Sequence, residues 1–394
     1  MRNKLIKLAL AVTLSSAALI ANAAPTYTFS ILESLGGTNK VGEANSINNS
    51  GQIVGKSKDA TGAYQATLWS SSSPSAPTLL QSPVTDTYAM SINNSGQIVG
   101  SNFDNSSRSF FWNSTNPNSP TELIALGGVG KESKAVGINN SGQIVGGSGM
   151  ANNHYNGTLW SPTSPSTYSP TELVALGGTA KQSEPWAIND TGLVTGWSQN
   201  NQGLRKAAAW YISSPNSPIL LESLGGTGKD GDVYAINDSG MIVGVSADAS
   251  NVQKATLWNI TSPNSPILLE SLGGTAKNAI AMGINASGMI VGFSANASNV
   301  EKATLWDGVN SPIDLNDYLD EASKSAGWVL NYAGDINDSG SIVGLASNSL
   351  LGLTSQAFLL QSVPAVPEAD TSAMLLMGAG VMGFMARRRK QVAA

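Results

Sequence analysis

The sequence lacks the residues on which many enzyme and metal sites depend. Its 394 residues include no Cys and a single His, His154. This excludes a Cys nucleophile, disulfides, Cys-based zinc or iron–sulfur sites and any site that needs two histidines. A Ser-His-Asp triad would have to use His154, which follows two Asn residues and is expected in a surface loop. Only 12% of the residues are charged, whereas soluble domains usually carry about 25%.

The few charges present argue against a nucleic-acid partner. Residues 1–23 hold three of the 21 Lys and Arg, and residues 387–390 hold four more. Without residues 1–23 and 364–394, the chain carries 24 acidic and 14 basic residues. Nucleic-acid binding requires a positively charged surface, so we predict none.

The N-terminus has the pattern of a secretory signal peptide. Three basic residues precede an apolar stretch from Leu8 to Ala21, and small residues stand at Ala21, Ala23 and Ala24. A basic start, a short apolar core and an Ala-x-Ala site are typical of such leaders. We predict a signal peptide over residues 1–23, cleaved after Ala23. The alternative is a first buried helix.

The C-terminus combines three features in a fixed order. A linker over residues 364–370 precedes a small, apolar segment over residues 371–386. As a helix this segment would span about 24 Å, slightly less than the hydrocarbon core of a bilayer. The tail over residues 387–394 begins with four cations that would hold this end in the cytoplasm, namely Arg387, Arg388, Arg389 and Lys390. We therefore predict a C-terminal transmembrane helix.

This tail resembles the PEP-CTERM sorting signal of Gram-negative bacteria that produce exopolysaccharide. The resemblance extends to Lys390 and begins at the motif Val366, Pro367 and Glu368, where Ala369 replaces the second Pro of the family. It implies processing by an exosortase-like membrane enzyme, with the helix held only transiently in the inner membrane. The protein would then reach the cell envelope, the cell surface or the extracellular space.

Between the two ends, one unit is repeated seven times. Its clearest mark is Ile-Asn-x-x-Gly, which recurs at intervals of 45 to 52 residues with its Asn at 48, 93, 139, 189, 237, 285 and 337. Each unit of about 48 residues holds four short β-prone stretches separated by turn-rich sequence. Propeller blades have this length and strand number. We therefore predict an all-β, seven-bladed β-propeller over residues 27–363; whether the first and last units exchange a strand to close the ring is left open.

Two residue types are assigned to structure rather than to ligand binding. The motif glycines, such as Gly240, suit the left-handed position of a hairpin turn. One large aromatic per unit is expected in the core, at Trp69, Trp112, Trp160, Trp210, Trp258 and Trp306, with Phe358 and Leu359 in the last unit. Three further tryptophans lie off this register and are better surface candidates: Trp186, Trp197 and Trp328.

The units also resemble the HAF-repeat extracellular family, in which Leu-Gly-Gly, Ile-Asn-x-x-Gly-x-Val-Val-Gly and His-Ala-Phe-Leu-Trp recur. Leu-Gly-Gly begins here at Leu35, Leu126, Leu176, Leu224 and Leu272, and the last unit ends with Gln356-Ala-Phe-Leu-Leu360. The His of the family name is replaced, for example by Lys254 and Gln356. The resemblance implies an exported, often surface-associated protein and carries no settled enzymatic activity.

One insertion interrupts the regular pattern of the last unit. It contains the acidic residues Asp317, Asp320 and Glu321, and Trp328 follows it. A ligand site would break the repeat in this way, and the carboxylates could bind a divalent cation outside the cell. A solvated acidic loop is the alternative. No cofactor and no catalytic or metal-ligating set is predicted.

These observations lead to a hypothesis of function. The chain is expected to be a non-enzymatic, exported propeller that serves as a structural or adhesive module in extracellular polysaccharide or biofilm. The expected partners are the exosortase-like enzyme and extracellular polysaccharide. A glycan-active enzyme similar to a glycosidase, or a carbohydrate-binding lectin, is the alternative.

Overall fold

The computed structural model describes residues 26–102, 107–150, 155–164, 167–275, 277–308 and 312–363. His154, the predicted signal peptide, the sorting linker, the apolar C-terminal segment and the basic tail lie outside these residues. Within the described part, no helix is long and apolar enough to cross a membrane. Tyr27–Val363 forms one compact unit.

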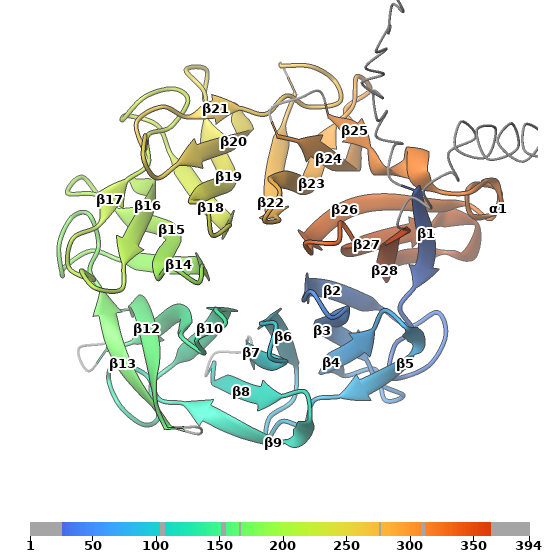
Figure 1. The fold of residues 1–394 in the computed structure, drawn as a ribbon, viewed down its shortest axis with the longest axis horizontal. Coiled ribbons are helices and arrows are strands. Elements are labelled where there is room, and N and C mark those ends of the chain that lie inside the picture. Colours follow the sequence, from blue (N-terminus) through green and yellow to red (C-terminus); the bar gives the residue numbers. More distant parts are fainter. Residues whose placement is uncertain are drawn as a thin grey trace, which may run out of the picture. The chain divides into compact units, whose positions relative to one another are not determined.

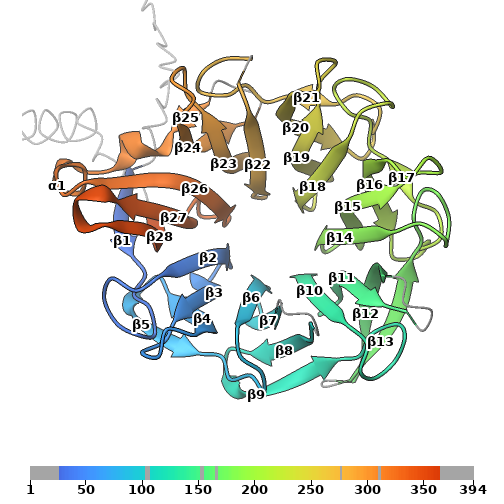
Figure 2. The ribbon, with the colours of Figure 1, turned by 180° about the vertical axis from the view of Figure 1, so that it is seen from behind.

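Seven four-stranded sheets stand in a circle around a central channel (Figures 1 and 2). In each sheet the strand nearest the channel is followed outward by its neighbours, mostly in chain order, and the paired strands are antiparallel. The prediction of an all-β, seven-bladed propeller with four-stranded blades is therefore confirmed.

The first six blades are continuous segments of the chain, and the strands of each follow one another from the channel outward. Blade one contains β2 (Gly42–Ile47), β3 (Gln52–Lys58), β4 (Tyr64–Ser70) and β5 (Ser73–Leu79). Blade two contains β6 (Thr87–Ile92), β7 (Gln97–Asn102), β8 (Ser109–Asn113) and β9 (Asn116–Leu123). Blade three contains β10 (Ser133–Ile138), β11 (Ile144–Gly149), β12 (Tyr155–Ser164) and β13 (Thr167–Leu173).

The next three blades follow the same order. Blade four contains β14 (Ser183–Ile188), β15 (Leu193–Gln199), β16 (Arg205–Tyr211) and β17 (Ile219–Leu220). Blade five contains β18 (Gly231–Ile236), β19 (Met241–Ala247), β20 (Gln253–Asn259) and β21 (Ile267–Leu268). Blade six contains β22 (Ala279–Ile284), β23 (Met289–Ala295), β24 (Glu301–Asp307) and β25 (Ile313–Asp314).

Blade seven joins the two ends of the ring. Its first three strands come from the end of the domain, β26 (Trp328–Ile336), β27 (Ile342–Asn348) and β28 (Leu353–Val363), whereas its outermost strand is the N-terminal β1 (Thr26–Ile31). The short helices η1 (Leu315–Tyr318), α1 (Glu321–Ser325) and η2 (Ser349–Leu351) accompany this blade. The strand exchange that the sequence left open therefore does close the ring, and each Leu-Gly-Gly segment follows the outermost strand of the preceding blade.

Glycine is required at two places in every blade. The turn glycines of the Ile-Asn-x-x-Gly motif all have positive φ, as in Gly240 at 77°, so the turn prediction is confirmed. The glycine of the following Ile-Val-Gly or its equivalent lies against the innermost strand. A Cβ on Gly55, for example, would lie 1.9 Å from the carbonyl oxygen of Glu43. Only glycine allows the first two strands of a blade to approach this closely.

Tryptophan fills the space between neighbouring blades. The six predicted core tryptophans are at most 1% exposed, and Trp112 packs with Val54 and Ala66 of the preceding blade. Each indole N–H also donates to a backbone carbonyl in the linker that enters its blade, at 2.6–2.7 Å. In blade seven the expected Phe358 and Leu359 do not take this place. Leu360 does, because it lies opposite Ile342 as Trp69 lies opposite Ile53.

We predict that Trp258→Phe lowers the free energy of unfolding by about 2–4 kcal/mol, because the carbonyl of Glu222 loses its buried donor and the smaller phenyl ring leaves part of the space between the blades unfilled. Chemical denaturation followed by circular dichroism measures this loss. Trp197→Phe is the control, since its indole N–H bonds to a partly exposed carboxylate and its loss should cost less. Equal losses in the two variants would contradict the role given to Trp258.

Candidate functional site

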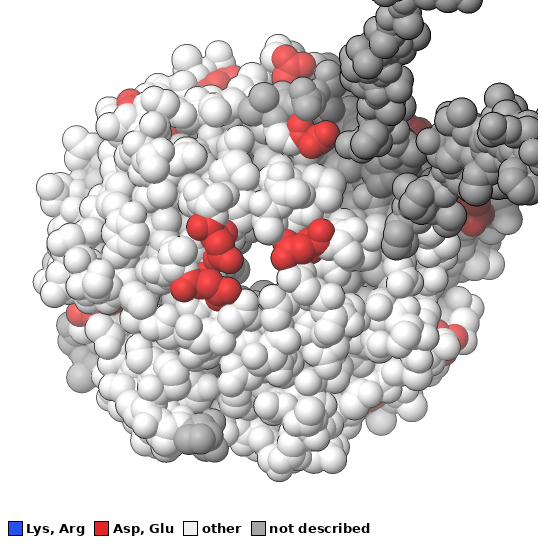
Figure 3. Space-filling view, viewed as in Figure 1, with Lys and Arg blue, Asp and Glu red and all other residues white. Residues whose placement is uncertain are grey.

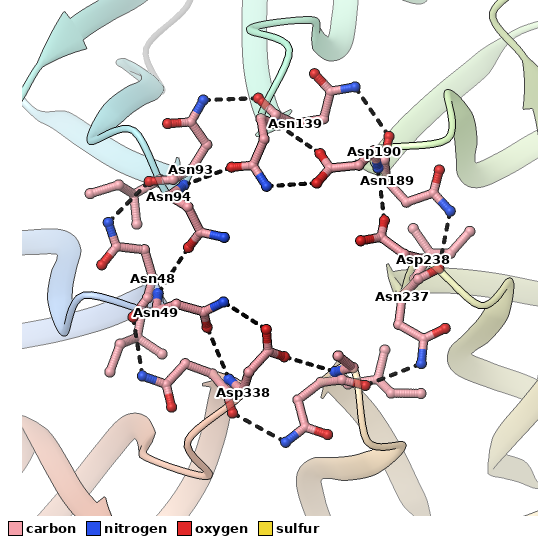
Figure 4. Close-up of a pocket in the computed structure, with 18 of the residues that line it drawn as sticks. Asn48, Asn49, Asn93, Asn94, Asn139, Asn189, Asp190, Asn237, Asp238 and Asp338 are labelled. Carbon is pink, nitrogen blue, oxygen red and sulfur yellow. Dashed lines mark hydrogen bonds between the residues drawn. The ribbon is translucent and has the colours of Figure 1, made fainter.

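At one end of the central channel, side chains from the seven equivalent turns form a closed ring. The Asn of each Ile-Asn-x-x-Gly motif donates its Nδ2–H to the backbone carbonyl of the equivalent Asn in the next blade, at 2.9–3.1 Å (Figure 4). Asn337 donates to Asn48, so the cycle closes between residues 289 positions apart. We call these residues the asparagine collar: Asn48, Asn93, Asn139, Asn189, Asn237, Asn285 and Asn337.

The other amide atom of each collar residue holds its own turn together. Asn139 Oδ1 accepts from the backbone N–H groups of Ser141 and Gln143, at 3.1 and 2.9 Å. One short side chain thus needs an acceptor toward its own turn and a donor toward the next blade. Asp has no donor, and the longer Gln would place its amide differently. Asparagine therefore meets both needs, since its amide oxygen holds the turn and its amide nitrogen joins the next blade.

The residue after each collar Asn forms a rim around the channel mouth, made of Asn49, Asn94, Asn140, Asp190, Asp238, Ala286 and Asp338. The backbone N–H of a rim residue donates to the side chain of the next one, as Asp190 does to Asp238 at 2.9 Å. Ala286 has no side-chain oxygen, so the series is interrupted at Asp238. The three aspartates are exposed, and acidic side chains lie on two sides of the opening in Figure 3, where no Lys or Arg is visible among the described residues.

The mouth between collar and rim encloses a cavity of about 220 Å³. Among the described residues, no group of three or more His, Cys, Asp or Glu side chains is placed to hold a metal ion. The bonds that line this mouth run from blade to blade, and the arrangement repeats with little change around the ring. This end of the channel is best explained as a structural closure.

The blades differ from one another toward the opposite end of the channel. Three residues before the collar Asn, the innermost strands carry Asn45, Met90, Val136, Trp186, Tyr234, Met282 and Gly334, which line a second cavity of about 210 Å³. The rings of Trp186 and Tyr234 lie 6.3 Å apart. The buried Trp186 Nε1 has no hydrogen-bond partner among the described residues. The residues that vary between blades, the aromatic pair and the unpaired indole N–H of Trp186 therefore lie in the same part of the channel.

Asp335 contributes a carboxylate to the same cavity. Its oxygens accept from the backbone N–H groups of Ile47 and Ile336, both at 2.9 Å, so it joins blade seven to blade one. Burial among the innermost strands raises the pKa of Asp335 to about 6, although these hydrogen bonds act in the opposite direction. The corresponding positions in other blades are uncharged, for example Ser46 and Ala187.

A cluster of aromatic and charged side chains extends from this cavity across blades four and five. The guanidinium of Arg205 lies 4.3 Å from the ring centroid of Trp197 and forms an ion pair with Asp232. Trp197 Nε1–H donates to Glu184 Oε2 at 3.2 Å. Burial raises the pKa of Asp232 to about 6, against the opposing effect of Arg205. We call Glu184, Trp186, Trp197, Arg205, Asp232 and Tyr234 the channel-end cluster.

Sequence reasoning identified only part of these sites. Trp186 and Trp197 stood out because they lie off the repeat register, and the structure brings both into the channel-end cluster. Arg205 and Asp232 were missed, since they lie 27 positions apart and neither belongs to a motif. The collar asparagines were seen as repeat marks without a role. The signal for a structural role was available in the sequence: the same residue type occurs in all seven copies, whereas the next position varies.

The residues predicted from the acidic insertion lie elsewhere, on the accessory helices of blade seven. Asp317 is part of η1, and Asp320 caps α1 by accepting from Ser323 N at 2.6 Å. Glu321 is almost fully exposed, with Lys324 at 3.8 Å. Trp328 packs against Phe29 of β1, with ring centroids 5.9 Å apart. None of these four residues lines the cavities described above, and a ligand site formed by them stays a prediction.

The PEP-CTERM protein-sorting motif matches residues 365–390, which confirms the sorting signal predicted for the C-terminus. The motif indicates an exported protein that an exosortase recognises and that is sorted to the cell envelope or surface. No curated protein matches the chain.

The chain is similar to solved structures at low sequence identity. A structure from a study of two prolyl endopeptidases is 9% identical, with a TM-score of 0.50, over 84% of this chain and 51% of that one. This chain thus spans about half the length of that protein. A lectin from Burkholderia pseudomallei is 12% identical over 86% and 99% of the two chains, with a TM-score of 0.44. A putative TolB from Agrobacterium tumefaciens is 13% identical over 62% and 89%, with a TM-score of 0.42.

We predict that Asn139→Asp destabilises the ring by about 1–3 kcal/mol, because the donor to the Asn189 carbonyl is lost and a carboxylate then faces that oxygen. Thermal and chemical denaturation measure the effect. Asn94→Ala is the matched control, since Ala286 naturally occupies the same rim position and a smaller loss is expected. A collar variant no less stable than this rim variant would refute the role of the collar.

We predict that stability decreases as pH rises from about 4 to about 6, in part because of Asp335. Its pKa is raised on folding, so the folded state binds the proton more tightly, and this contribution disappears once both states are ionised. Asp335→Asn should flatten the melting temperature profile in this window, with Asp232 retaining part of the slope. Asp59, whose pKa is lowered to about 2 by hydrogen bonds from Thr61 and Gln65, is the control. Asp59→Asn should change the profile only below about pH 4, and an unaltered slope in Asp335→Asn would contradict the prediction.

Proposed function

We propose that this chain is an exported, non-enzymatic propeller that binds polysaccharide in the cell envelope or extracellular matrix. There it acts as a structural or adhesive module. Its leader would be removed after Ala23, and an exosortase would process the chain near Pro367 although Ala369 replaces the second Pro of the motif. The inner membrane would hold the chain only until this step.

The positions of the two processing sites support this route. The strand that closes the ring, β1, begins at Thr26, three residues after the proposed leader cleavage site. The last strand, β28, ends at Val363, four residues before Pro367. Removal of both ends would therefore leave every strand of the described residues in the mature protein. Sorting and folding do not compete for the same residues.

The difference between the two ends of the channel is the observation that carries the proposal. One end repeats the same Asn in every blade and serves to close the ring. The other gathers tryptophan, tyrosine, carboxylates and an arginine from blades four and five. Aromatic rings pack against the C–H faces of sugars, and paired charges bond to their hydroxyl groups. This surface is suited to a carbohydrate.

A binding function fits the carboxylates of this end better than hydrolysis does. A glycosidase needs two carboxyl groups that face the scissile bond. Here Asp335 bonds to two backbone N–H groups, Asp232 pairs with Arg205, and Glu184 accepts from Trp197. A glycan-active enzyme is the second candidate, because the raised pKa of Asp232 close to Glu184 is a feature of general acids.

We predict that the mature chain, residues 24–367, binds extracellular polysaccharide prepared from its native host. Co-sedimentation would show binding, and an assay of reducing ends in the same samples would show cleavage. Binding without release of reducing ends is the expected result. Absence of binding would contradict the proposal, and steady release of reducing ends would establish the enzymatic alternative instead.

A further inference from the structure

A pocket at the outer end of the channel-end cluster lies where blades four, five and six meet. It encloses about 420 Å³ where the innermost strand of blade five begins. Residues of three consecutive blades line it: Arg205 from blade four, Asp230, Asp232, Tyr234, Val245 and Gln253 from blade five, and Ile280 from blade six. Because the asparagine collar follows β18 at its other end, the pocket lies at the end of the channel away from the collar.

The lining divides into an apolar wall and a polar edge. Val245, Ile280 and the ring of Tyr234 supply the wall, and Arg205, Asp232 and Gln253 supply the edge. A pyranose ring has the same division, with an apolar face of C–H groups and a periphery of hydroxyl groups. A mixed lining of this kind holds a sugar in one orientation.

The polar edge is already arranged before any ligand enters. Arg205 is stacked on Trp197 and paired with Asp232, whose carboxylate also accepts from Val233 N at 3.0 Å. The side chain of Arg205 is 46% exposed and that of Asp232 11%, so further N–H groups of the guanidinium face solvent. A side chain held in place loses little entropy when a ligand binds.

Positive charge is not in excess around the pocket. Arg205 and the nearby Lys206 stand beside Asp230, Asp232 and Glu184. An anionic sugar would find no excess of positive charge here. A neutral sugar would meet charged donors and acceptors for its hydroxyl groups, which are the stronger kind of hydrogen bond.

We propose that this pocket binds a neutral pyranose unit of a polysaccharide. Its C–H face lies on Tyr234 and Ile280, and two of its hydroxyl groups bond to Asp232 and Arg205. The inference rests on the proposed function, in that it names the sugar class and the residues that would recognise it.

The test uses the mature chain and isothermal titration with neutral oligosaccharides (glucan, galactan and mannan fragments) and with uronate-containing oligosaccharides. Wild type is expected to bind a neutral set more tightly than the uronates. Arg205→Lys keeps the charge but loses the planar fork, and Tyr234→Leu keeps an apolar wall but loses the ring. Each should weaken binding about 10-fold or more, the usual loss for a charged hydrogen bond or a stacked ring.

Glu43→Gln is the matched control. Glu43 occupies in blade one the strand position that Asp232 occupies in blade five, and it is likewise ion-paired, with Lys56 at 3.0 Å, but it does not line the pocket. The Glu43→Gln variant should bind the oligosaccharides with the same affinity as wild type. Melting temperatures of all variants separate lost binding from lost folding, and Tyr234→Leu keeps the test valid if Arg205→Lys does not fold.

The outcomes separate this inference from the proposed function. If wild type binds host polysaccharide and both pocket variants bind it equally well, the pocket assignment is wrong while the proposed function stands. If wild type binds neutral oligosaccharides through this pocket but not host polysaccharide, the assignment holds and the proposed function is wrong. Tighter binding of uronates than of neutral sugars would also overturn the inference.

Discussion

The structure depends on a closed cycle of hydrogen bonds between asparagine amides and backbone carbonyls. Each collar residue serves two blades at once, because its oxygen holds its own turn and its nitrogen reaches the next one. The cycle has no end at which an amide stays unpaired: Asn337 donates to Asn48 as any other member does to its neighbour. This mutual dependence explains why a single residue type occupies the position in every blade, while the adjacent rim tolerates Asn, Asp and Ala.

The outer parts of the blades are held by different means. Buried tryptophans fill the spaces between sheets and tie each blade to the linker that enters it. The seam is closed by the N-terminal strand, which completes the last blade, and by Asp335, which bonds across to Ile47. Blade seven, with Leu360 in place of tryptophan, thus gains contacts from both ends of the domain.

Because the collar, the buried tryptophans and the seam hold the blades together, the residues at one end of the channel can differ between blades. The close approach of the first two strands and the turns at the collar constrain every copy alike. The side chains that the innermost strands direct into the channel carry no such constraint, and there Trp186 and Tyr234 occur in one blade each. The channel-end cluster, for which we propose carbohydrate binding, lies where the copies differ.

The number of blades, the four strands in each, the turn glycines and the buried tryptophans could all be predicted from the amino-acid sequence. These features follow from local backbone geometry and from patterns within one unit. The strand exchange at the seam, the collar cycle and the meeting of Arg205 with Asp232 emerged only in the folded ring. They arise from contacts between units, which depend on how the ring closes, and a pattern read along one unit contains no information about what its neighbour places beside it. The acidic insertion shows the same limit, since Asp320 caps a helix and Trp328 packs on β1.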